Sequence, residues 1–387
     1  MGVDRDGVIV LFKGHSLYGS VAAMVDQLTE ALRRQGFETA TFDTRAPDCV
    51  ASILTVLRQN RVRAFLSLNG YGLPAAGQGA GFYELTDAPV VIYFVDHPAY
   101  HFPTIRSPVP RLAVSFPTAH HVAFCGDHVR GDIAIRHLPH ATEPAEPAPW
   151  EARDIPLFLS ATLAADAEAF RAAWRQHGPA VEAQLNAIVD AHDADPVRPL
   201  HEHILAVLGT APPIEVLSSY FRMADIYLRC RAKQRMVAAL SDLPLVLCGE
   251  GWDAARFAGT AIRYLGPRPV TETISLMRRT QVVLNPLPPY FGSHERPLQA
   301  MANGAVAAIG PSDYLAAAFP TRGYLALPYD AAAAAAALEQ ALQDGDRLQA
   351  LAQAGHADGF SAHLWDRCAA AILAELNDTA PVELART

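Results

Sequence analysis

Short apolar runs alternate with amphipathic segments along nearly the whole chain. In the first half, Val21, Met24, Val25, Leu28 and Leu32 recur at helical spacing, whereas the apolar runs on either side are the length of buried strands. The strands predicted in this half are 7–12, 37–42, 64–68, 89–95, 111–116 and 121–125, and the helices are 21–34 and 50–59. Strands that alternate with helices indicate an α/β domain with a parallel sheet.

The second half of the chain shows the same alternation of strands and helices. Its predicted strands are 155–160, 243–248, 261–265, 281–285, 305–309 and 324–327, and its helices are 271–279, capped by Thr271, 295–302, 331–343 and 362–376. The alanine-rich stretches within 162–240 are predominantly helical. The sequence therefore predicts a second α/β domain that carries a helical insertion near its start.

A proline-rich polar stretch at 143–150 marks the boundary between the halves. The length of 387 residues also favours two domains, at about 150 residues each. We expect a first domain over 1–145, a second over 146–361 that includes the helical segment 162–240, and a final helical segment over 362–387.

Composition argues against several classes of protein. The net charge is −9, so bulk attraction to nucleic acid or anionic lipid is not expected. No run approaches the roughly 18 uninterrupted apolar residues of a membrane span. The five cysteines form no C-x-x-C pair, and the first residues lack the pattern of a secretory signal. We expect a cytoplasmic protein, and only Lys13 and Lys233 among 31 basic residues are lysine, which favours a GC-rich bacterial source.

The stretch 281–310 reads as strand, loop, helix, small-residue turn and strand. Open α/β sheets bind ligands beyond the carboxyl ends of their strands, and a helix N-terminus favours an anion. Gly292 would let a phosphate approach the backbone closely. The other candidate contacts here are Asn285, Ser293, His294, Glu295 and Arg296.

The segment L-Q-A-M-A-N-G-A-V-A-A at 298–308 resembles the L-E-A-M-A-x-G-x-P-V-V-A segment of GT-B glycosyltransferases. The forms H-E-R-P-L-Q-A-M-A-N-G, Y-F-V-D-H-P and C-G-E-G-W, at 294–304, 93–98 and 248–252, are most similar to the bacterial spore-maturation (CgeB-like) branch. The resemblance covers most of the chain. It implies two Rossmann-like domains that face each other across a cleft, with the final helix crossing back to the first domain.

The resemblance also implies an activity of the hexosyltransferase type. A sugar would move from a nucleotide-diphosphate sugar to a hydroxyl of a surface glycan, a lipid-linked glycan or a protein, without a metal or other cofactor. The donor would contact Gly251, Gly266, Pro267, Arg268, Asn285, Gly292, Ser293, His294, Glu295 and Gln299. Many retaining members carry two glutamates where this chain has Phe291 and Gln299, which leaves inversion or retention open.

In the first domain, the resemblance implies that the loop after the first strand faces the cleft. His15 in that loop would be a general base, because an imidazole exchanges protons near neutral pH. Asp96 and His97 follow the most apolar strand and would be a base or an acceptor contact. The alternatives are a surface histidine at 15, and an Asp96 that only caps the turn before Pro98.

Other motifs are weaker. The match of 249–254 to G-x-G-x-x-A is not a dinucleotide fingerprint, because a strand resumes by Ala261 and leaves no room for a long helix. Arg231 and Arg235 share a helix face that either contacts a pyrophosphate or is solvated. We expect no metal at 201–203. The alternative functions are a non-catalytic sugar- or nucleotide-binding protein and a nucleotide-sugar epimerase or hydrolase.

Overall fold

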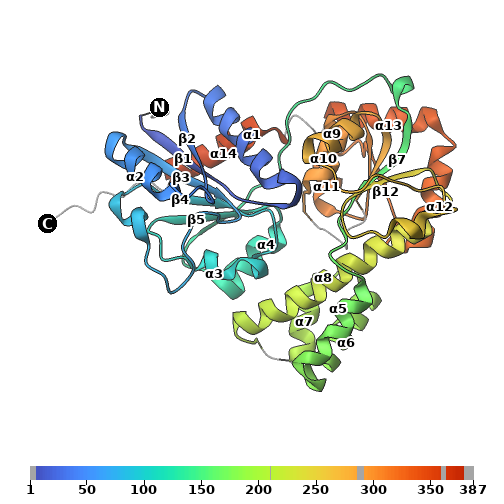
Figure 1. Ribbon diagram of the computed structural model, residues 1–387, viewed down its shortest axis with the longest axis horizontal. Helices are drawn as coiled ribbons and strands as arrows, with labels where there is room; N and C mark the ends of the chain where they lie inside the picture. The colour runs from blue at the N-terminus through green and yellow to red at the C-terminus, as the bar shows by residue number, and fades with distance from the viewer. Residues whose placement is uncertain (1–5, 210, 286–291, 359–362, 379–387) are drawn as a thin grey trace. The chain divides into compact units, whose positions relative to one another are not determined.

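The computed structural model describes residues 6–209, 211–285, 292–358 and 363–378 (Figure 1). The chain divides into two compact units. Unit 1 comprises Met1–Ala141 and His363–Thr387, and unit 2 comprises Thr142–Ala362. Each unit is built around its own six-stranded sheet, in which every pair of neighbouring strands is parallel.

Unit 1 has the strand order β2-β1-β3-β4-β5-β6. Its strands are β1 (Val8–Lys13), β2 (Glu38–Asp43), β3 (Val62–Leu68), β4 (Val90–Tyr93), β5 (Leu112–Phe116) and β6 (Ala134–His137). Its α-helices are α1 (Ser20–Arg34), α2 (Cys49–Gln59), α3 (Phe102–Ile105), α4 (Ala119–Phe124) and α14 (Trp365–Asp378). The central strands β1, β3 and β4 are almost entirely buried, as their continuous apolar runs predict.

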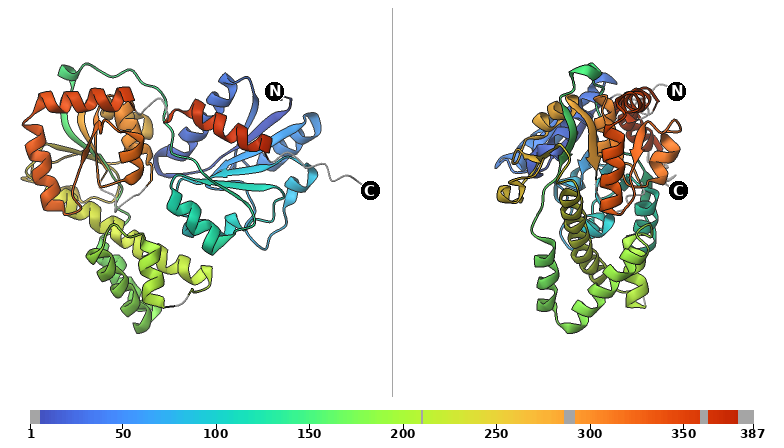
Figure 2. Two further views of the ribbon diagram at one scale, coloured as in Figure 1. Left: turned by 180° about the vertical axis from the view of Figure 1, so that it is seen from behind. Right: turned by 90° about the vertical axis from the view of Figure 1, so that its right-hand side faces the viewer.

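Helices α1 and α14 lie side by side on one face of this sheet (Figures 1 and 2). Their apolar faces bury residues such as Leu28 and Ile372 against Ile9 and Leu11 of β1. Trp365 is fully buried, and its indole Nε1 donates to Gln27 Oε1 at 2.8 Å. The segment that begins at His363 therefore completes the core of unit 1. The opposite face holds an aromatic cluster that includes Phe12, Phe65 and Tyr83.

The prediction of a strand at 121–125 is wrong. Residues Ala119–Phe124 form α4, because the Thr118 side chain accepts hydrogen bonds from the N–H groups of His120 and His121 and so caps a helix. The last strand of the sheet is instead β6, which the sequence analysis did not predict.

Unit 2 has the strand order β12-β11-β10-β7-β8-β9. Its strands are β7 (Ile155–Ser160), β8 (Leu245–Cys248), β9 (Arg263–Tyr264), β10 (Thr280–Asn285), β11 (Val306–Ile309) and β12 (Tyr324–Ala326). The helices that pack on this sheet are α8 (Ile214–Ala239), α9 (Val270–Arg278), α10 (Glu295–Ala302), α11 (Asp313–Ala318), α12 (Ala331–Leu342) and α13 (Gly345–Asp358). Helices α5 (Ala167–Ala173), α6 (Pro179–Ala194) and α7 (Leu200–Leu208) form a group with the first half of α8, away from the sheet (Figure 1).

The two faces of this sheet have separate apolar cores. On one face, α12, α13 and the end of α8 pack through residues such as Leu338, Leu348 and Val237. On the other, α9, α10 and α11 pack through residues such as Met277, Leu298 and Leu315. Open sheets with helices on both faces bind ligands beyond the carboxyl ends of their strands, so any ligand site of this sheet is expected there.

Two details of unit 2 differ from the sequence prediction. Helix α9 begins at Val270 with Pro269 at the N-cap position, so Thr271 does not cap it. Helices α11 and α13 were not predicted, because their short or alanine-rich sequences lack a strong apolar stripe.

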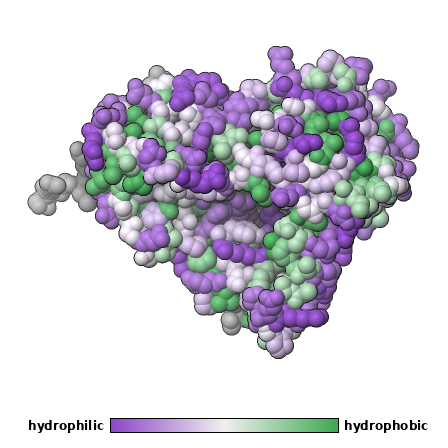
Figure 3. All heavy atoms as spheres, viewed as in Figure 1, coloured by the Kyte–Doolittle hydropathy of each residue, from purple (hydrophilic) through white to green (hydrophobic). Residues whose placement is uncertain are grey.

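Neither the visible surface nor the described helices show a membrane-spanning element. Polar and apolar side chains are interspersed on the face of each unit that Figure 3 shows. Within the described residues, no helix combines the length and apolarity that a membrane span requires.

Candidate functional site

Each sheet has one place where the order of the strands reverses. In unit 1 this switch point lies between β1 and β3, and in unit 2 it lies between β7 and β10. Connections leave the two strands of a switch point toward opposite faces of the sheet, which opens a crevice at their carboxyl ends. Polar side chains gather at both switch points, and they are of opposite chemical character.

At the switch point of unit 1, His15 follows β1 and Tyr71 follows β3. The Tyr71 hydroxyl donates to the backbone carbonyl of His15, and the His15 Nε2 atom lies 3.6 Å from Asp43 Oδ1 at the end of β2. The Tyr71 ring lies so close to Gly14 that a Cβ there would come within 2.1 Å of it. Gly14 is therefore required for this packing, which holds the His15 loop beside β3. The His15 side chain itself stays partly exposed.

Asp96 follows β4, beside the same cluster. Its Oδ2 atom accepts a hydrogen bond from Asn69 Nδ2 at 2.9 Å and lies 3.7 Å from His101 Nε2. Asn69 also accepts from the Val95 N–H through Oδ1, so its amide fixes the turn after β4. Burial raises the pKa of Tyr71, and the negative charge of Asp96 adds to this rise. Asp96 is thus a half-exposed carboxylate held in place beside Tyr71.

His97 is placed differently from His15 and Asp96. It is buried, and its Nδ1 atom accepts a hydrogen bond from the Ala99 N–H at 3.1 Å. Its ring packs edge-on against Phe124 and His121, with centroids 4.6 and 4.7 Å away. This geometry orders the turn Pro98–Tyr100, and it surrounds the imidazole with other rings of unit 1.

The switch point of unit 2 is cationic. Lys233 on α8 donates through Nζ to the carbonyl of Thr162, just after β7, at 2.8 Å. Arg296 in the first turn of α10 donates to Oδ1 of Asn285, the last residue of β10. One cation is therefore attached to each of the two strands that form the switch point.

The pKa values show that these cations are crowded. Burial lowers the pKa of Lys233 to about 8, and the positive charge of Arg296 contributes to the fall. Burial also lowers the pKa of Arg296, and the adjacent Glu295 carboxylate opposes this. Two neighbouring cations that are both destabilised by burial form a favourable environment for an anion.

The N-terminus of α10 lies beside the two cations. His294 is its N-cap, and the His294 Nδ1 atom accepts from the Arg296 N–H at 3.2 Å and lies 3.1 Å from Glu295 Oε2. Gly292 and Ser293 are buried, and the Gly292 carbonyl accepts from Ser312 Oγ at 3.2 Å. Gln299 lies one turn into α10, on the helix that carries Arg296, and is half-buried.

The loops after β8 and β9 are tied to each other and to the loop after β7. A Cβ at Gly251, where φ is +85°, would come within 1.8 Å of the Leu163 carbonyl, so this glycine permits a contact between two loops. Gly266 accepts from the Gly249 N–H at 3.0 Å. Next to it, the Pro267 carbonyl accepts from Arg268, whose Nε atom lies 3.5 Å from Glu272 Oε2. Arg268 is thus part of a surface ion pair.

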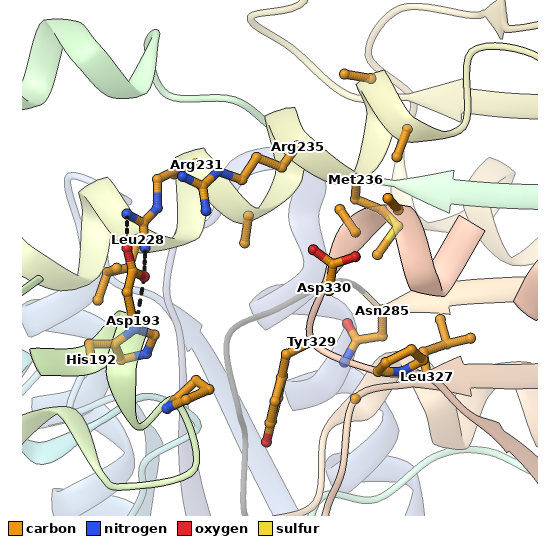
Figure 4. A pocket seen from close by; sticks show the side chains of 18 residues that line it. His192, Asp193, Leu228, Arg231, Arg235, Met236, Asn285, Leu327, Tyr329 and Asp330 are labelled. Carbon is orange, nitrogen blue, oxygen red and sulfur yellow. Dashed lines mark hydrogen bonds and ion pairs between the residues drawn. The ribbon is translucent and has the colours of Figure 1, made fainter. Parts of the chain in front are cut away.

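A pocket of about 730 Å³ opens at the same edge of unit 2 (Figure 4). Residues from α6, α8, the ends of β10, β11 and β12, and the start of α12 line it. Asn285 lines this pocket and also holds Arg296, so the pocket adjoins the cationic switch point.

Several residues of these clusters were not singled out as candidate site residues. Lys233 was noted only as one of the two lysines of the chain. Asp43, Asn69 and Tyr71 carried no sequence signal beyond their positions at strand ends. Phe291, where the first family glutamate would stand, lies outside the described residues. Among the described residues, no group of three or more histidine, cysteine, aspartate or glutamate side chains is arranged to hold a metal ion.

The comparisons with known proteins agree with this architecture. Residues 229–374 match a protein-family model described as glycosyl transferase-like. The comparison with curated proteins gave no significant match. Among solved structures, similar ones include sucrose-phosphate synthase from Thermosynechococcus elongatus, with a TM-score of 0.56 and 13% sequence identity, covering 96% of this chain and 98% of that one.

Two further structures are similar over the whole chain. A glycosyltransferase from Rickettsia africae has a TM-score of 0.57 and 10% identity, with 97% of this chain and 99% of that one covered. AviGT4, a glycosyltransferase involved in avilamycin A biosynthesis, has a TM-score of 0.52 and 14% identity, with 96% and 97% covered. The fold is that of the GT-B glycosyltransferases. The expected fold class is therefore confirmed, whereas the resemblance to the spore-maturation branch stays a prediction.

Proposed function

We propose that this GT-B protein is a glycosyltransferase that takes its sugar from a nucleotide-diphosphate sugar. The observation that carries the proposal is the pair of crowded cations, Lys233 and Arg296, at the switch point of unit 2. Both side chains bond to the ends of strands that flank the crevice, and both lie near the N-terminus of α10. A diphosphate bound there would relieve their mutual repulsion and accept hydrogen bonds from them.

This arrangement also accounts for the chemistry of the departing group. When the bond to the sugar breaks, negative charge builds up on the diphosphate, and fixed positive groups stabilise it. Lys233, Arg296 and the positive end of α10 would fulfil this role without a bound metal ion. Ser293, His294, Glu295 and Gln299 would contact the rest of the donor from the same helix.

The loops after β8 and β9 are proposed to contact the nucleotide. Gly266 leaves open space beside its α-carbon, and Gly251, Pro267 and Arg268 shape the adjoining turns. The surface ion pair of Arg268 with Glu272 can be exchanged for a phosphate contact at little cost, since exposed pairs contribute about 0–1 kcal/mol.

Unit 1 would supply the base for an inverting transfer. His15 is partly exposed, and its Nε2 atom lies 3.6 Å from the Asp43 carboxylate. This carboxylate would stabilise the imidazolium that forms when His15 takes the proton of the acceptor hydroxyl. Asp96, fixed by Asn69, would hold an acceptor hydroxyl or act as the base in place of His15. His97 is proposed to position Asp96 through the ordered turn that follows it.

We further propose that the protein is a hexosyltransferase of the spore-maturation branch. Its acceptor would be a surface glycan, a lipid-linked glycan or a protein. A cytoplasmic location would fit the five free cysteines, four of which are buried.

A thermal-shift screen tests the donor site first. UDP, GDP, ADP and dTDP, and sugars linked to them, are added to the full chain, because a ligand that binds the folded state raises its melting temperature. Stabilisation by at least one diphosphate, followed by sugar transfer to an added acceptor in a product assay, would support the proposal. Release of free sugar with no transfer would point to a donor hydrolase, and the absence of any shift would refute the donor site.

A further inference from the structure

The pocket beside the cationic switch point is a site with its own chemistry. Lys233 of helix α8 bonds to Thr162, whereas Arg231 and Arg235 of the same helix line the pocket (Figure 4). Tyr329 and Asp330, from the loop between β12 and α12, also line the pocket. None of these four pocket residues belongs to the proposed diphosphate contacts.

The two arginines of the pocket are in different electrostatic states. Arg231 forms two parallel hydrogen bonds with the Asp193 carboxylate at the end of α6, so its charge is compensated within the protein. Arg235 is exposed, and none of the described residues forms an ion pair or hydrogen bond with it. One guanidinium in the pocket wall therefore has its five N–H donors available.

The opposite wall does not neutralise this charge. Asp330, the carboxylate among the described residues of that wall, caps α12 by accepting from the Ala333 N–H through Oδ1 at 2.8 Å. There the positive end of the helix macrodipole offsets part of its charge. Asn285 contributes a further donor, because Oδ1 is engaged by Arg296 and no described residue accepts from Nδ2.

The rest of the lining suits the body of a sugar. Leu228, Met236, Leu327 and Pro328 form an apolar surface, and Tyr329 adds an aromatic side chain against which the C–H face of a sugar ring can pack. The volume of about 730 Å³ falls within the usual range of small-molecule sites, about 300–1,000 Å³.

We propose that this pocket binds a sugar that carries an anionic group, a carboxylate or a phosphate, which pairs with Arg235. The inference rests on the proposed glycosyl transfer, since it assigns an acidic sugar to one of the two substrates. The sugar is either the acceptor or the part of the donor that extends past Asn285 from the diphosphate.

Calorimetric titrations of the full chain test this inference. Glucuronic acid, glucose 6-phosphate and glucose are the free-sugar ligands, and UDP-glucuronic acid and UDP-glucose are the donor ligands, with UDP alone for reference. We expect an acidic sugar, free or nucleotide-linked, to bind at least tenfold more tightly than its neutral counterpart. Preference in the free-sugar series would assign the acidic group to the acceptor, and preference in the nucleotide-linked series would assign it to the donor.

Two variants with opposite expected effects make the test specific. R235Q is expected to abolish the preference for the acidic sugar and leave UDP affinity unchanged. D330N is expected to strengthen binding of the acidic sugar, because asparagine caps a helix as well as aspartate but carries no like charge. R347Q, an exposed change on α13, is the matched control.

Equal affinity for acidic and neutral sugars, a preference that survives R235Q, or no sugar binding up to the solubility limit would each overturn the inference. If UDP and the other nucleoside diphosphates bind and the acidic sugars do not, only this inference fails. If no diphosphate binds, the proposed function fails as well.

Discussion

The switch points of the two sheets occupy equivalent places and present opposite chemistry. In unit 1, the strand ends between β2 and β4 carry the imidazole of His15 and the carboxylates of Asp43 and Asp96. In unit 2, the strands β7 and β10 are bridged to Lys233 and Arg296, which can only offer positive charge at neutral pH. We propose that the same topology thus provides one site for activating a hydroxyl and one for holding a diphosphate.

The largest effect is expected from His15→Ala. Loss of a general base lowers turnover by about 10²- to 10⁴-fold, and the affinity for nucleoside diphosphate should not change, because that site belongs to unit 2. Steady-state transfer rates and calorimetry measure the two quantities. His177→Ala, an exposed histidine of unit 2, is the control. Unchanged turnover in both His15→Ala and Asp96→Ala would disprove the assignment of the base to unit 1.

The next largest effect is expected from Lys233→Gln. A hydrogen bond to a charged group contributes about 1.5–3 kcal/mol, so the dissociation constant of the nucleoside diphosphate should rise about ten- to a hundredfold. Since glutamine can donate to the Thr162 carbonyl and removes a charge that burial destabilises, the melting temperature of the unligated variant should not fall below that of the parent. If the variant binds the diphosphate as tightly as the parent does, Lys233 does not contact the diphosphate.

The pH dependence of diphosphate binding also tests the role of the Lys233 charge. The pKa of Lys233 is lowered to about 8, so its positive charge is lost as the pH rises through that value. Diphosphate affinity should therefore fall above pH 8, by up to about tenfold per pH unit for one linked proton, and the fall should vanish in Lys233→Gln. An affinity that is constant from pH 7 to pH 9.5 would contradict the assigned role.

The unligated protein should show the opposite trend in stability. Between about pH 8 and the ordinary lysine pKa of 10.5, the unfolded chain still holds a proton that folded Lys233 has released. Linkage then requires the contribution of Lys233 to the free energy of unfolding to increase with pH across that window. Urea unfolding of the parent and of Lys233→Gln isolates this contribution, and identical pH profiles would show that the lysine is not perturbed.

The smallest effect is expected from Tyr71→Phe. This change removes the hydroxyl that donates to the His15 carbonyl and keeps the ring against Gly14. A typical hydrogen bond contributes about 0.5–1.5 kcal/mol, so transfer should slow by about two- to tenfold, with diphosphate affinity unchanged. A matched change in unit 2, Tyr264→Phe, removes a hydrogen bond to the Gly249 carbonyl and should affect donor affinity instead. If the two effects were exchanged, the division of roles between the units would be wrong.

The sequence predicted most of the fold because buried parallel strands have an unambiguous apolar pattern. The strand at 155–160 and the helix at 295–302 have the bounds that were expected. The prediction of a strand at 121–125 failed because the apolar run V-A-F-C fits a buried strand as well as a helix. The capping of α4 by Thr118 favours the helix. Helix α13 was not predicted because, in its alanine-rich sequence, no polar face is clearly distinct from an apolar face.

The candidate sites were less predictable than the fold. Gly292 to Glu295 were predicted as donor contacts because a helix N-terminus after a strand is a local feature of the sequence, and their role stays a prediction. Lys233 and Arg296 are 63 positions apart, and only the fold, which attaches them to the ends of the neighbouring strands β7 and β10, reveals that the charge of one acts on the other. Similarly, the contact of Tyr71 with Gly14 joins the loops that follow β1 and β3, two strands that pair in the sheet but are distant in sequence.

The most direct test of the central claim is the affinity of the double variant Lys233→Gln/Arg296→Gln for nucleoside diphosphates, compared with that of the parent chain. Calorimetric titration with UDP, GDP, ADP and dTDP, each beside its nucleoside, separates the diphosphate contribution from that of the base. We predict that the parent binds at least one diphosphate far more tightly than the nucleoside and that the double variant loses this difference. Equal diphosphate affinity in the two proteins would contradict the account.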